Sequence, residues 1–444
     1  MSRRDIALKY FDEQQEFMQT TVEQNIERYR KGDGRITVCN EKGEPIVGAK
    51  ITLKQKTHAF KYGANIFMLD ELETPEKNQA YRDGFKEIFN LATIPFYWNT
   101  LEPEQGKPRY AKDSPKIYRR PAVDLCMEYC AENNIEPKCH CLNYDSFAPD
   151  WLKDADVDTH KKALDKRFRE LSERYSDKIP SWEVTNETLI AYAPDNSFRK
   201  FYNEDDFVEW SFHTAERYFP NNRLIINDYG TFDYGFRGNR TPFYMQIERL
   251  FHNGVWHLDS IGMQFHSFFP KASESYMSFY RYNPKGLYSV LDTFAKFGKA
   301  LQITEMTIPA YSAEQEDEDI QAELIEKLYT VFFSHPAMEA IIYWNAVDGY
   351  AWRAEPGDMT AGENVYYGGL MRFDLTKKKA FHVIDELFNK KWRTQTSVTT
   401  GKDGKATFRG FYGDYELQME IDGKTVTKQI SLLPTKNNVY TVSL

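Results

Sequence analysis

The sequence predicts an α/β protein, a (β/α)8 TIM barrel, with a small accessory β-sandwich-like module formed by its N- and C-terminal segments. Eight short apolar or β-branched runs recur across the middle of the chain. The stretches between them are long enough for helices, and turn-rich β segments lie at both ends of the sequence. Eight strand–helix units favour a closed barrel over an open doubly wound sheet.

The eight predicted strands lie inside residues 57–390. They cover residues 61–66, 92–98, 137–142, 181–186, 224–228, 260–266, 301–305 and 340–345. Charged, periodic runs at 158–177 and 316–333 predict two of the helices between them. No strand is followed by a GxGxxG or GxxxxGK[ST] loop, so the main signature of a nucleotide cofactor is missing.

The two ends of the chain predict the accessory module. Residues 1–33 read as an N-terminal helix that the GDG at 32–34 stops, and 34–56 read as a β hairpin around a Gly-Pro turn. Residues 391–444 alternate short strands with DG and GD turns. We expect the hairpin and the C-terminal segment to pack together beside the catalytic barrel of residues 57–390.

Composition excludes several classes of protein. The net charge is −9 with acidic and basic residues interspersed, so the chain lacks the basic stripe of a nucleic-acid partner. No apolar run is long enough for a secretory signal or a membrane span. We therefore expect a cytoplasmic protein that binds neither nucleic acid nor membrane. The abundant Phe, Tyr and Trp suit a site whose walls stack on sugar rings.

The cysteines do not suggest a disulfide framework. There are five, an odd number. Cys126 and Cys130 have helical spacing, while Cys139 and Cys141 flank His140 on a predicted strand. A zinc site is conceivable, but the pattern favours buried thiols. We predict no metal and no cofactor.

Two glutamates point to the chemistry. Glu187 closes WEVTNE (182–187), and Glu305 lies in LQITEM (301–306). Groups at the carboxyl ends of barrel strands converge on one pocket, where a pair of carboxylates is the minimum needed to cleave a glycosidic bond. Most glutamates are ordinary surface residues. A strand before each glutamate, and Asn186 beside the first, weaken that interpretation.

Nearby polar residues fit a retaining mechanism. In that mechanism one carboxylate attacks the anomeric carbon while the other, protonated, assists the leaving oxygen, with about 5–5.5 Å between them. Two carboxylates this close raise the pKa of one of them. Asn186 could hold a sugar 2-hydroxyl. Gln264 and His266 end the sixth strand, where a hydrogen bond could keep Glu305 ionised.

Further blocks surround these motifs in a fixed order. They are FNLATIPFYWNTLEPEQG (89–106), KCHCL (138–142), LIINDY (224–229), DSIGMQFH (259–266) and IIYWNAVDGYAW (341–352). Together with WEVTNE and ITEM they resemble glycoside hydrolase family 10, the retaining β-1,4-xylanases, over roughly residues 57–390. GFYGDY at 410–415 is similar to β additions of plant-type members. Seven blocks in order are a specific signal.

The resemblance implies roles for individual residues. Glu187 would be the acid/base and Glu305 the nucleophile, with Asn186 on the 2-hydroxyl and His266 bridging to Glu305. The other implied substrate contacts are His140, Gln264, Trp344, Trp352 and Tyr229.

Three of these substrate contacts have structural alternatives. His140 could be a core histidine, and Trp344, inside an apolar strand, could belong to the barrel core. Trp352 lies on a polar loop, which favours contact with a ligand.

The part of the site that holds the glycone departs from the family pattern. Thr93, Ile94 and Tyr97 stand where the family usually has the Glu, Asn and Lys that grip the sugar. Tyr144 and Asp145 follow the third strand where Trp and His are usual. We therefore count Tyr97, Tyr144 and Asp145 as candidate substrate contacts that rebuild this part of the site.

The expected function is a retaining glycoside hydrolase that cleaves β-1,4-linked xylan fragments or xylo-oligosaccharides by double displacement, with an oligosaccharide as its partner. One alternative keeps the mechanism but acts on a different β-linked plant glycoside or a small-molecule glycoside. Another is a non-catalytic sugar-binding barrel. A metal-dependent hydrolase would need a ligand cluster such as His-x-His on a strand, which the sequence lacks. The sugar, the endo or exo mode and the oligomeric state stay open.

Overall fold

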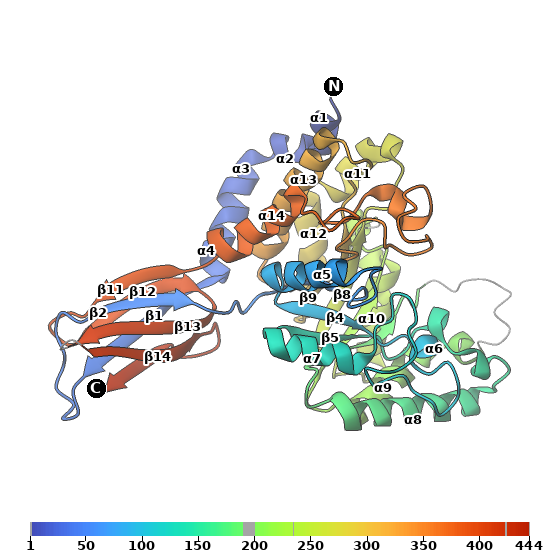
Figure 1. Cartoon of the computed structure of the whole chain (residues 1–444), viewed down its shortest axis with the longest axis horizontal. Helices are drawn as coiled ribbons and strands as arrows, with labels where there is room; N and C mark the ends of the chain where they lie inside the picture. The colour runs from blue at the N-terminus through green and yellow to red at the C-terminus, as the bar shows by residue number, and fades with distance from the viewer. Residues whose placement is uncertain (1, 190–199, 234, 422–423, 444) are drawn as a thin grey trace.

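The computed structural model describes residues 2–189, 200–233, 235–421 and 424–443. Its centre is a closed barrel of parallel strands in the order β10-β3-β4-β5-β6-β7-β8-β9 (Figure 1). The strands are β3 Lys61–Asn65, β4 Leu91–Pro95, β5 Glu136–His140, β6 Ser181–Asn186, β7 Arg223–Asp228, β8 Ser260–His266, β9 Ala300–Thr307 and β10 Met338–Tyr343. All eight predicted strands, and the predicted barrel, are confirmed.

Helices follow the strands and surround the barrel. They include α5 Pro75–Ile88, α6 Trp98–Leu101, α7 Val123–Asn133, α8 Val157–Tyr175, α9 Phe207–Tyr218, α10 Pro242–His252, α11 Glu274–Arg281, α12 Pro284–Ala295, α13 Gln315–Ser334 and α14 Lys379–Asp385. Side chains of Thr74, Asp156, Thr241 and Asn283 each accept a hydrogen bond from a first-turn N–H, which fixes where α5, α8, α10 and α12 begin. The predicted helices at 158–177 and 316–333 match α8 and α13.

The barrel strands are buried on both faces, so they carry apolar side chains together with polar ones that find partners inside the barrel. Successive residues of β6 point in opposite directions. Trp182 packs on Phe219, which follows α9, with 4.3 Å between ring centroids. Glu183 instead binds Lys138 and His140 of β5. All five cysteines are buried and unpaired.

The accessory module consists of two sheets. Their strands are β1 Lys31–Cys39, β2 Lys50–Gln55, β11 Gln395–Thr399, β12 Lys405–Phe411, β13 Gly413–Ile421, β14 Lys424–Leu432 and β15 Val439–Ser443. One sheet has the order β12-β1-β15 and the other β11-β2-β13-β14. Each sheet therefore joins strands from both ends of the chain, as predicted. A core separate from that of the barrel, including Ile36, Leu53 and Leu417, lies within the module.

The predicted hairpin at 34–56 is wrong. β1 and β2 lie in different sheets, and each pairs with C-terminal strands. The reason is that each strand buries one face only when the C-terminal segment supplies its neighbours, which local turn signals do not reveal.

The predicted helix stop is also wrong. The N-terminal helical stretch is a series of pieces, α1 Arg3–Ala7, α2 Lys9–Glu13, α3 Gln15–Phe17, a π-helical turn Met18–Glu23 and α4 Gln24–Tyr29. It ends before the GDG, which belongs to β1. Gly34 has a packing role there, because a Cβ at this position would lie 2.3 Å from the ring of Phe408.

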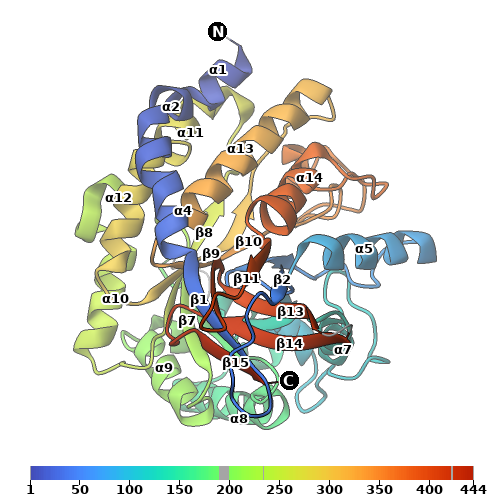
Figure 2. The same ribbon diagram turned by 90° about the vertical axis from the view of Figure 1, so that its left-hand side faces the viewer.

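The module lies at the end of the barrel where the strands begin. His58 and Phe60, just before β3, pack with Phe333 of α13, whose ring also stacks on Trp392 at 4.1 Å. Phe411 of β12 joins the same cluster. In Figure 1 the module is on the left and α6, which follows β4, is on the right; Figure 2 looks at the barrel from the side of the module. The strand ends that carry the predicted site thus face away from the module. Within the described ranges, no helix has both the length and the apolar character needed to cross a bilayer.

Truncating the core of the module should destabilise the protein without changing its chemistry. Leu417 is fully buried there, so Leu417→Ala should lower the free energy of unfolding by about 2–5 kcal/mol. Thermal unfolding measures this change, and kcat/KM of the folded fraction should stay the same. Gln418→Ala, on the exposed side of the same strand, is the matched control. A fall in kcat/KM for the folded Leu417→Ala protein would contradict the separation of module and site.

Candidate active site

Glu187 and Glu305 both lie where barrel strands end. Glu187 directly follows β6 and has φ 51°, in the left-handed region that few non-glycine residues adopt. Its N–H donates to the carbonyl of Asn227 at 3.1 Å, which ties this turn to β7. Glu305 lies within β9 and is 3% exposed. Backbone strain held in place by neighbouring strands is typical of functional positions.

Three side-chain amides connect the two carboxylates. Asn227 Nδ2 donates to Asn186 Oδ1 at 2.7 Å and to Glu305 Oε1 at 2.9 Å. Gln264 Nε2 donates to Glu187 Oε1 at 3.0 Å and to Asn186 Oδ1 at 3.3 Å. Residues from β6, β7, β8 and β9 thus form one hydrogen-bonded network, here called the carboxylate network.

His266 holds the other oxygen of Glu305. Its Nε2 lies 3.1 Å from Glu305 Oε2, and its Nδ1 lies 3.0 Å from Thr307 Oγ1. Burial lowers the pKa of His266 to about 4, so the imidazole is neutral at pH 7. In the tautomer that fits, Nε2–H donates to Glu305 and the Thr307 hydroxyl donates to Nδ1.

His140 is held between two partners on the neighbouring strand ends. It is 1% exposed, its Nδ1 bonds to the Glu183 carboxylate, and its Nε2 lies 3.0 Å from the Tyr97 hydroxyl. Burial opposes a charge on His140, but the carboxylate of Glu183 outweighs it and raises the pKa. Lys138 also binds Glu183, so this carboxylate is fully paired.

The environment of Glu305 disfavours its charge. Burial, together with the charges of Glu187 and Glu183, raises the pKa of Glu305 to about 8, against the opposing effects of His140 and the Asn227 hydrogen bond. The influence of Glu187 shows that the two carboxylates interact. In the protein without a ligand, Glu305 is therefore largely protonated at neutral pH.

Replacing Glu305 by glutamine should stabilise the folded protein. A carboxyl group with a raised pKa costs stability as the pH rises from its unfolded value of about 4.5 through about 8. Glu305→Gln removes this cost, which is on the order of 3 kcal/mol at pH 7. Thermal unfolding should show a gain of several degrees at pH 8 that disappears at pH 4, where Glu305 is protonated in both states. A gain that does not depend on pH would contradict the assignment.

Aromatic side chains surround the carboxylate network. The ring of Trp344, 6% exposed, lies 5.2 Å from the rings of Phe67 and His140 and 6.1 Å from that of His266. Tyr144, after β5, donates its hydroxyl to Glu187 Oε2. Trp352 is 39% exposed, with its ring 5.7 Å from Phe147. The structure thus brings Tyr97, Tyr144, Trp344 and Trp352 to the same end of the barrel as the two glutamates.

Asp145 and Tyr229 lie at the border of this region. Asp145 begins the 3-10 turn Asp145–Phe147 and accepts a hydrogen bond from the Ser146 hydroxyl at 3.3 Å. Tyr229 follows β7, and its N–H donates to Asp228 Oδ1 at 2.9 Å.

Several site residues were not among the predicted ones. Asn227 lies in LIINDY and Glu183 in WEVTNE, so the alternation of strand residues could have pointed to both. Arg119 and Arg120 come from the long loop between α6 and α7, and both are buried beside the aromatic side chains. No sequence signal marks them, because their contacts arise only when the loop folds back on the barrel.

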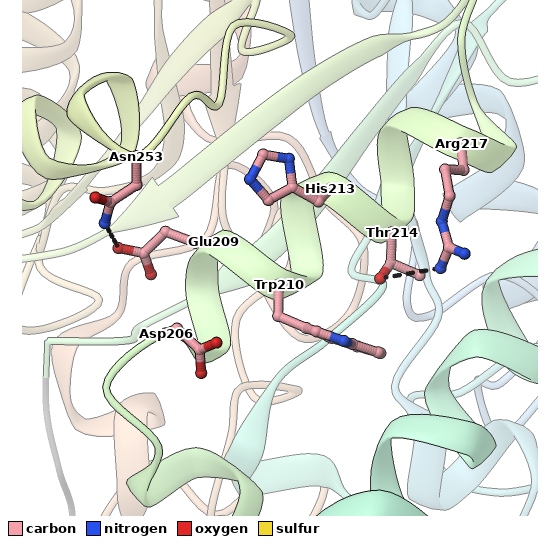
Figure 3. A pocket seen from close by; sticks show the side chains of 7 residues that line it. All are labelled: Asp206, Glu209, Trp210, His213, Thr214, Arg217 and Asn253. Atoms are coloured by element: carbon pink, nitrogen blue, oxygen red, sulfur yellow. Dashed lines mark hydrogen bonds between the residues drawn. The ribbon is translucent and has the colours of Figure 1, made fainter.

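A separate cavity of about 520 Å³ lies on the outer side of the barrel (Figure 3). It is formed on α9 by Asp206, Glu209, Trp210, His213, Thr214, Arg217 and, beyond α10, Asn253. Asn253 Nδ2 donates to Glu209 Oε1 at 2.9 Å, as Figure 3 shows. None of the predicted site residues lines this cavity, so it is distinct from the carboxylate network.

Known proteins are similar in sequence to most of this chain. The chain is 24% identical to the anti-sigma-I factor RsgI6 of Acetivibrio thermocellus over 405 residues, 90% of this chain and 46% of that protein. It is also 24% identical to endo-1,4-beta-xylanase 1 of Arabidopsis thaliana over 406 residues, 90% of this chain and 37% of that protein. The chain therefore spans less than half of the length of either relative.

Solved structures show the same barrel. Xylanase 10B from Thermotoga petrophila RKU-1, in complex with xylobiose, superposes with a TM-score of 0.58 at 22% identity, covering 75% of this chain and 95% of that one. Native xylanase 10B from Thermotoga maritima has a TM-score of 0.57 at 22% identity, covering 75% and 96%. The family model of glycosyl hydrolase family 10 matches residues 58–387, most of the chain and the whole barrel. The chain belongs to glycosyl hydrolase family 10.

Proposed function

We propose that the protein is a retaining glycoside hydrolase that cleaves β-1,4-linked xylo-oligosaccharides or xylan fragments, with Glu187 as acid/base and Glu305 as nucleophile. The observation that carries this proposal is the carboxylate network. It joins two glutamates, 118 positions apart in the sequence, through the amides of Asn186, Asn227 and Gln264.

The first chemical step forms a covalent intermediate. The proton of Glu305 first moves to Glu187. Glu305 then attacks the anomeric carbon while Glu187 gives that proton to the leaving oxygen, and the sugar is transferred to Glu305 with inverted configuration. Neutral His266 and the Asn227 amide each donate to Glu305, so they orient the attacking carboxylate. Asn186 contributes a side chain beside both glutamates for a sugar 2-hydroxyl.

The second step releases the sugar. Glu187, now ionised, takes a proton from water, and the oxygen of that water displaces Glu305 from the anomeric carbon. Two inversions give overall retention. Tyr144 donates to Glu187, and this hydrogen bond orients the carboxylate for the second step.

The substrate class rests on the relatives. Proteins named endo-1,4-beta-xylanase recur among them, and the similar Thermotoga petrophila structure holds xylobiose. Xylo-oligosaccharides are therefore the first substrates to test.

The stereochemistry of the product tests the mechanism. Proton NMR of xylo-oligosaccharide hydrolysis should show the β-anomer of the new reducing end first, followed by mutarotation. An initial α-anomer would mean that a water attacks directly, and it would remove Glu305 from the nucleophile role. If xylo-oligosaccharides bind but are not hydrolysed, the proposed hydrolase activity is wrong and the protein is a non-catalytic sugar-binding barrel.

A further inference from the structure

Two adjacent arginines are buried beside the carboxylate network, and no carboxylate among the described residues forms an ion pair with either of them. Arg119 is 3% exposed and Arg120 5% exposed. Arg119 Nη2 donates to Asn345 Oδ1 at 2.9 Å, and Arg120 Nη1 donates to the carbonyl of Arg119 at 2.8 Å. Arg119 Nε, Arg119 Nη1 and Arg120 Nε are buried without an acceptor, and neither guanidinium forms an ion pair within the described part of the chain.

Burying two guanidinium groups in this way is energetically unfavourable unless a ligand supplies a negative charge. A buried charge without a counter-ion is strongly disfavoured, and two neighbouring like charges add to the penalty. Burial lowers the pKa of Arg120 to about 10, and the charge of Arg119 acts in the same direction. Glu363 acts electrostatically on Arg119, but the hydrogen bonds connect the two only through Asn345, whose Nδ2 donates to Glu363 Oε2 at 3.2 Å. Arg119, Arg120 and Glu363 together therefore carry more positive than negative charge.

The loop that carries the arginines is firmly held. Arg109, 7% exposed, donates to the carbonyls of Thr100 and Pro115, both at 2.8 Å. Arg119 has φ 61°, a strained left-handed conformation that aims its side chain. The loop therefore presents the guanidinium groups in a set geometry instead of leaving them on a solvated surface.

The guanidinium of Arg120 lies next to the sugar-binding residues. It is 4.1 Å from the centroid of the Tyr97 ring and 5.6 Å from that of Trp352. The Tyr97 hydroxyl bonds to His140, and His140 packs against Trp344. A ligand group that meets Arg120 would thus be beside the sugar unit over Glu305, under the half-exposed Trp352.

We infer that Arg119 and Arg120 bind a carboxylate carried by the glycone, so that the substrate is an acidic oligosaccharide whose uronic acid is the sugar that Glu305 attacks or its neighbour. This rests on the proposed function and narrows its substrate class. Guanidinium groups suit the task because their N–H donors match a planar carboxylate in pairs. In the protein without a ligand, cation–π contacts with the surrounding aromatic rings stabilise the guanidinium of Arg120.

Matched pairs of substrates test this inference. The first pair is 4-nitrophenyl β-D-glucuronide and 4-nitrophenyl β-D-glucoside. They differ only at C6, which is a carboxylate in the first and a hydroxymethyl group in the second. The second is 4-nitrophenyl β-xylobioside with and without a glucuronic acid on its distal xylose. In at least one pair kcat/KM should favour the acidic member by about 10- to 100-fold, as expected for a desolvated charge pair. High salt should weaken this preference only modestly, because the site is buried.

Variants of the arginines should remove the preference. Arg120→Met and Arg119→Met keep the aliphatic stem, and each should lower kcat/KM for the acidic member much more than for the neutral member, which abolishes most of the acidic preference. Arg120→Lys keeps the positive charge but loses the paired N–H donors of the guanidinium. It should therefore retain part of the acidic preference. Arg409→Met, on the exposed face of the module, is the control and should leave the preference intact. A loss that is equal for acidic and neutral substrates would overturn the inference.

Binding measurements test the arginine site independently of the proposed hydrolase activity. Calorimetry on the Glu305→Gln protein, with xylobiose and glucuronosyl-xylobiose, does not depend on turnover. Tighter binding of the acidic ligand that Arg120→Met abolishes would support the arginine site even if no glycoside were hydrolysed. Equal affinities, combined with no acidic preference in either substrate pair, would overturn the arginine site and leave the hydrolase standing.

Discussion

Replacing Glu305 by alanine should abolish hydrolysis of every β-glycoside, including those with activated aryl leaving groups. Without the carboxylate no covalent intermediate forms, and a good leaving group cannot compensate for a missing nucleophile. The loss in kcat should be on the order of 10⁴-fold or more, by analogy with removal of nucleophiles in other covalent enzymes. Initial rates with an aryl xyloside and with xylo-oligosaccharides measure it.

The control for this experiment is the fold of the variant. Glu305 accepts from Asn227 and His266, so its removal leaves two donors without their acceptor. The circular dichroism spectrum and the binding of xylo-oligosaccharides should nevertheless persist in Glu305→Gln, whose amide has nearly the same shape and whose oxygen can keep one of the two contacts. A folded Glu305→Ala protein with substantial activity on aryl glycosides would assign the nucleophile to another residue.

Replacing Glu187 by alanine should slow hydrolysis to a degree that depends on the leaving group. A sugar alcohol leaves poorly without a proton, so xylo-oligosaccharides should lose about 10²- to 10⁴-fold in kcat/KM. A nitrophenolate leaves without assistance, so kcat/KM for the aryl glycoside should fall far less. Steady-state kcat for the aryl glycoside should still drop, because the second step needs Glu187 as a base.

The second step offers an internal check on this assignment. Pre-steady-state measurements on the Glu187→Ala protein should show a burst of nitrophenolate followed by slow turnover, since the covalent intermediate accumulates. Glu216→Ala, which removes an exposed glutamate of α9, is the matched control and should behave as the wild type. Equal losses on sugar and aryl leaving groups would remove Glu187 from the acid role.

The barrel can be predicted from the sequence because its strands are buried on both sides. Such strands are rich in apolar and β-branched residues, and all eight predicted strands occur in the closed barrel. The module was harder to place. β1 and β2 are neighbours in the sequence, yet they pair with β12 and β13 from the other end of the chain, which no local turn signal indicates. The GDG at 32–34 predicts a helix stop, but it belongs to β1, where Gly34 makes room for Phe408.

The sequence by itself determined the eight-stranded barrel and placed two glutamates at the ends of its strands. Those features depend on local burial patterns and on short motifs, which a linear chain displays. Only the tertiary structure decided that Asn227 links Asn186 to Glu305, and that Arg119 and Arg120 are buried beside the site with nitrogens that find no acceptor among the described residues. Desolvation and pairing depend on residues far apart in the chain, so the charge balance of the site exists only in the folded molecule.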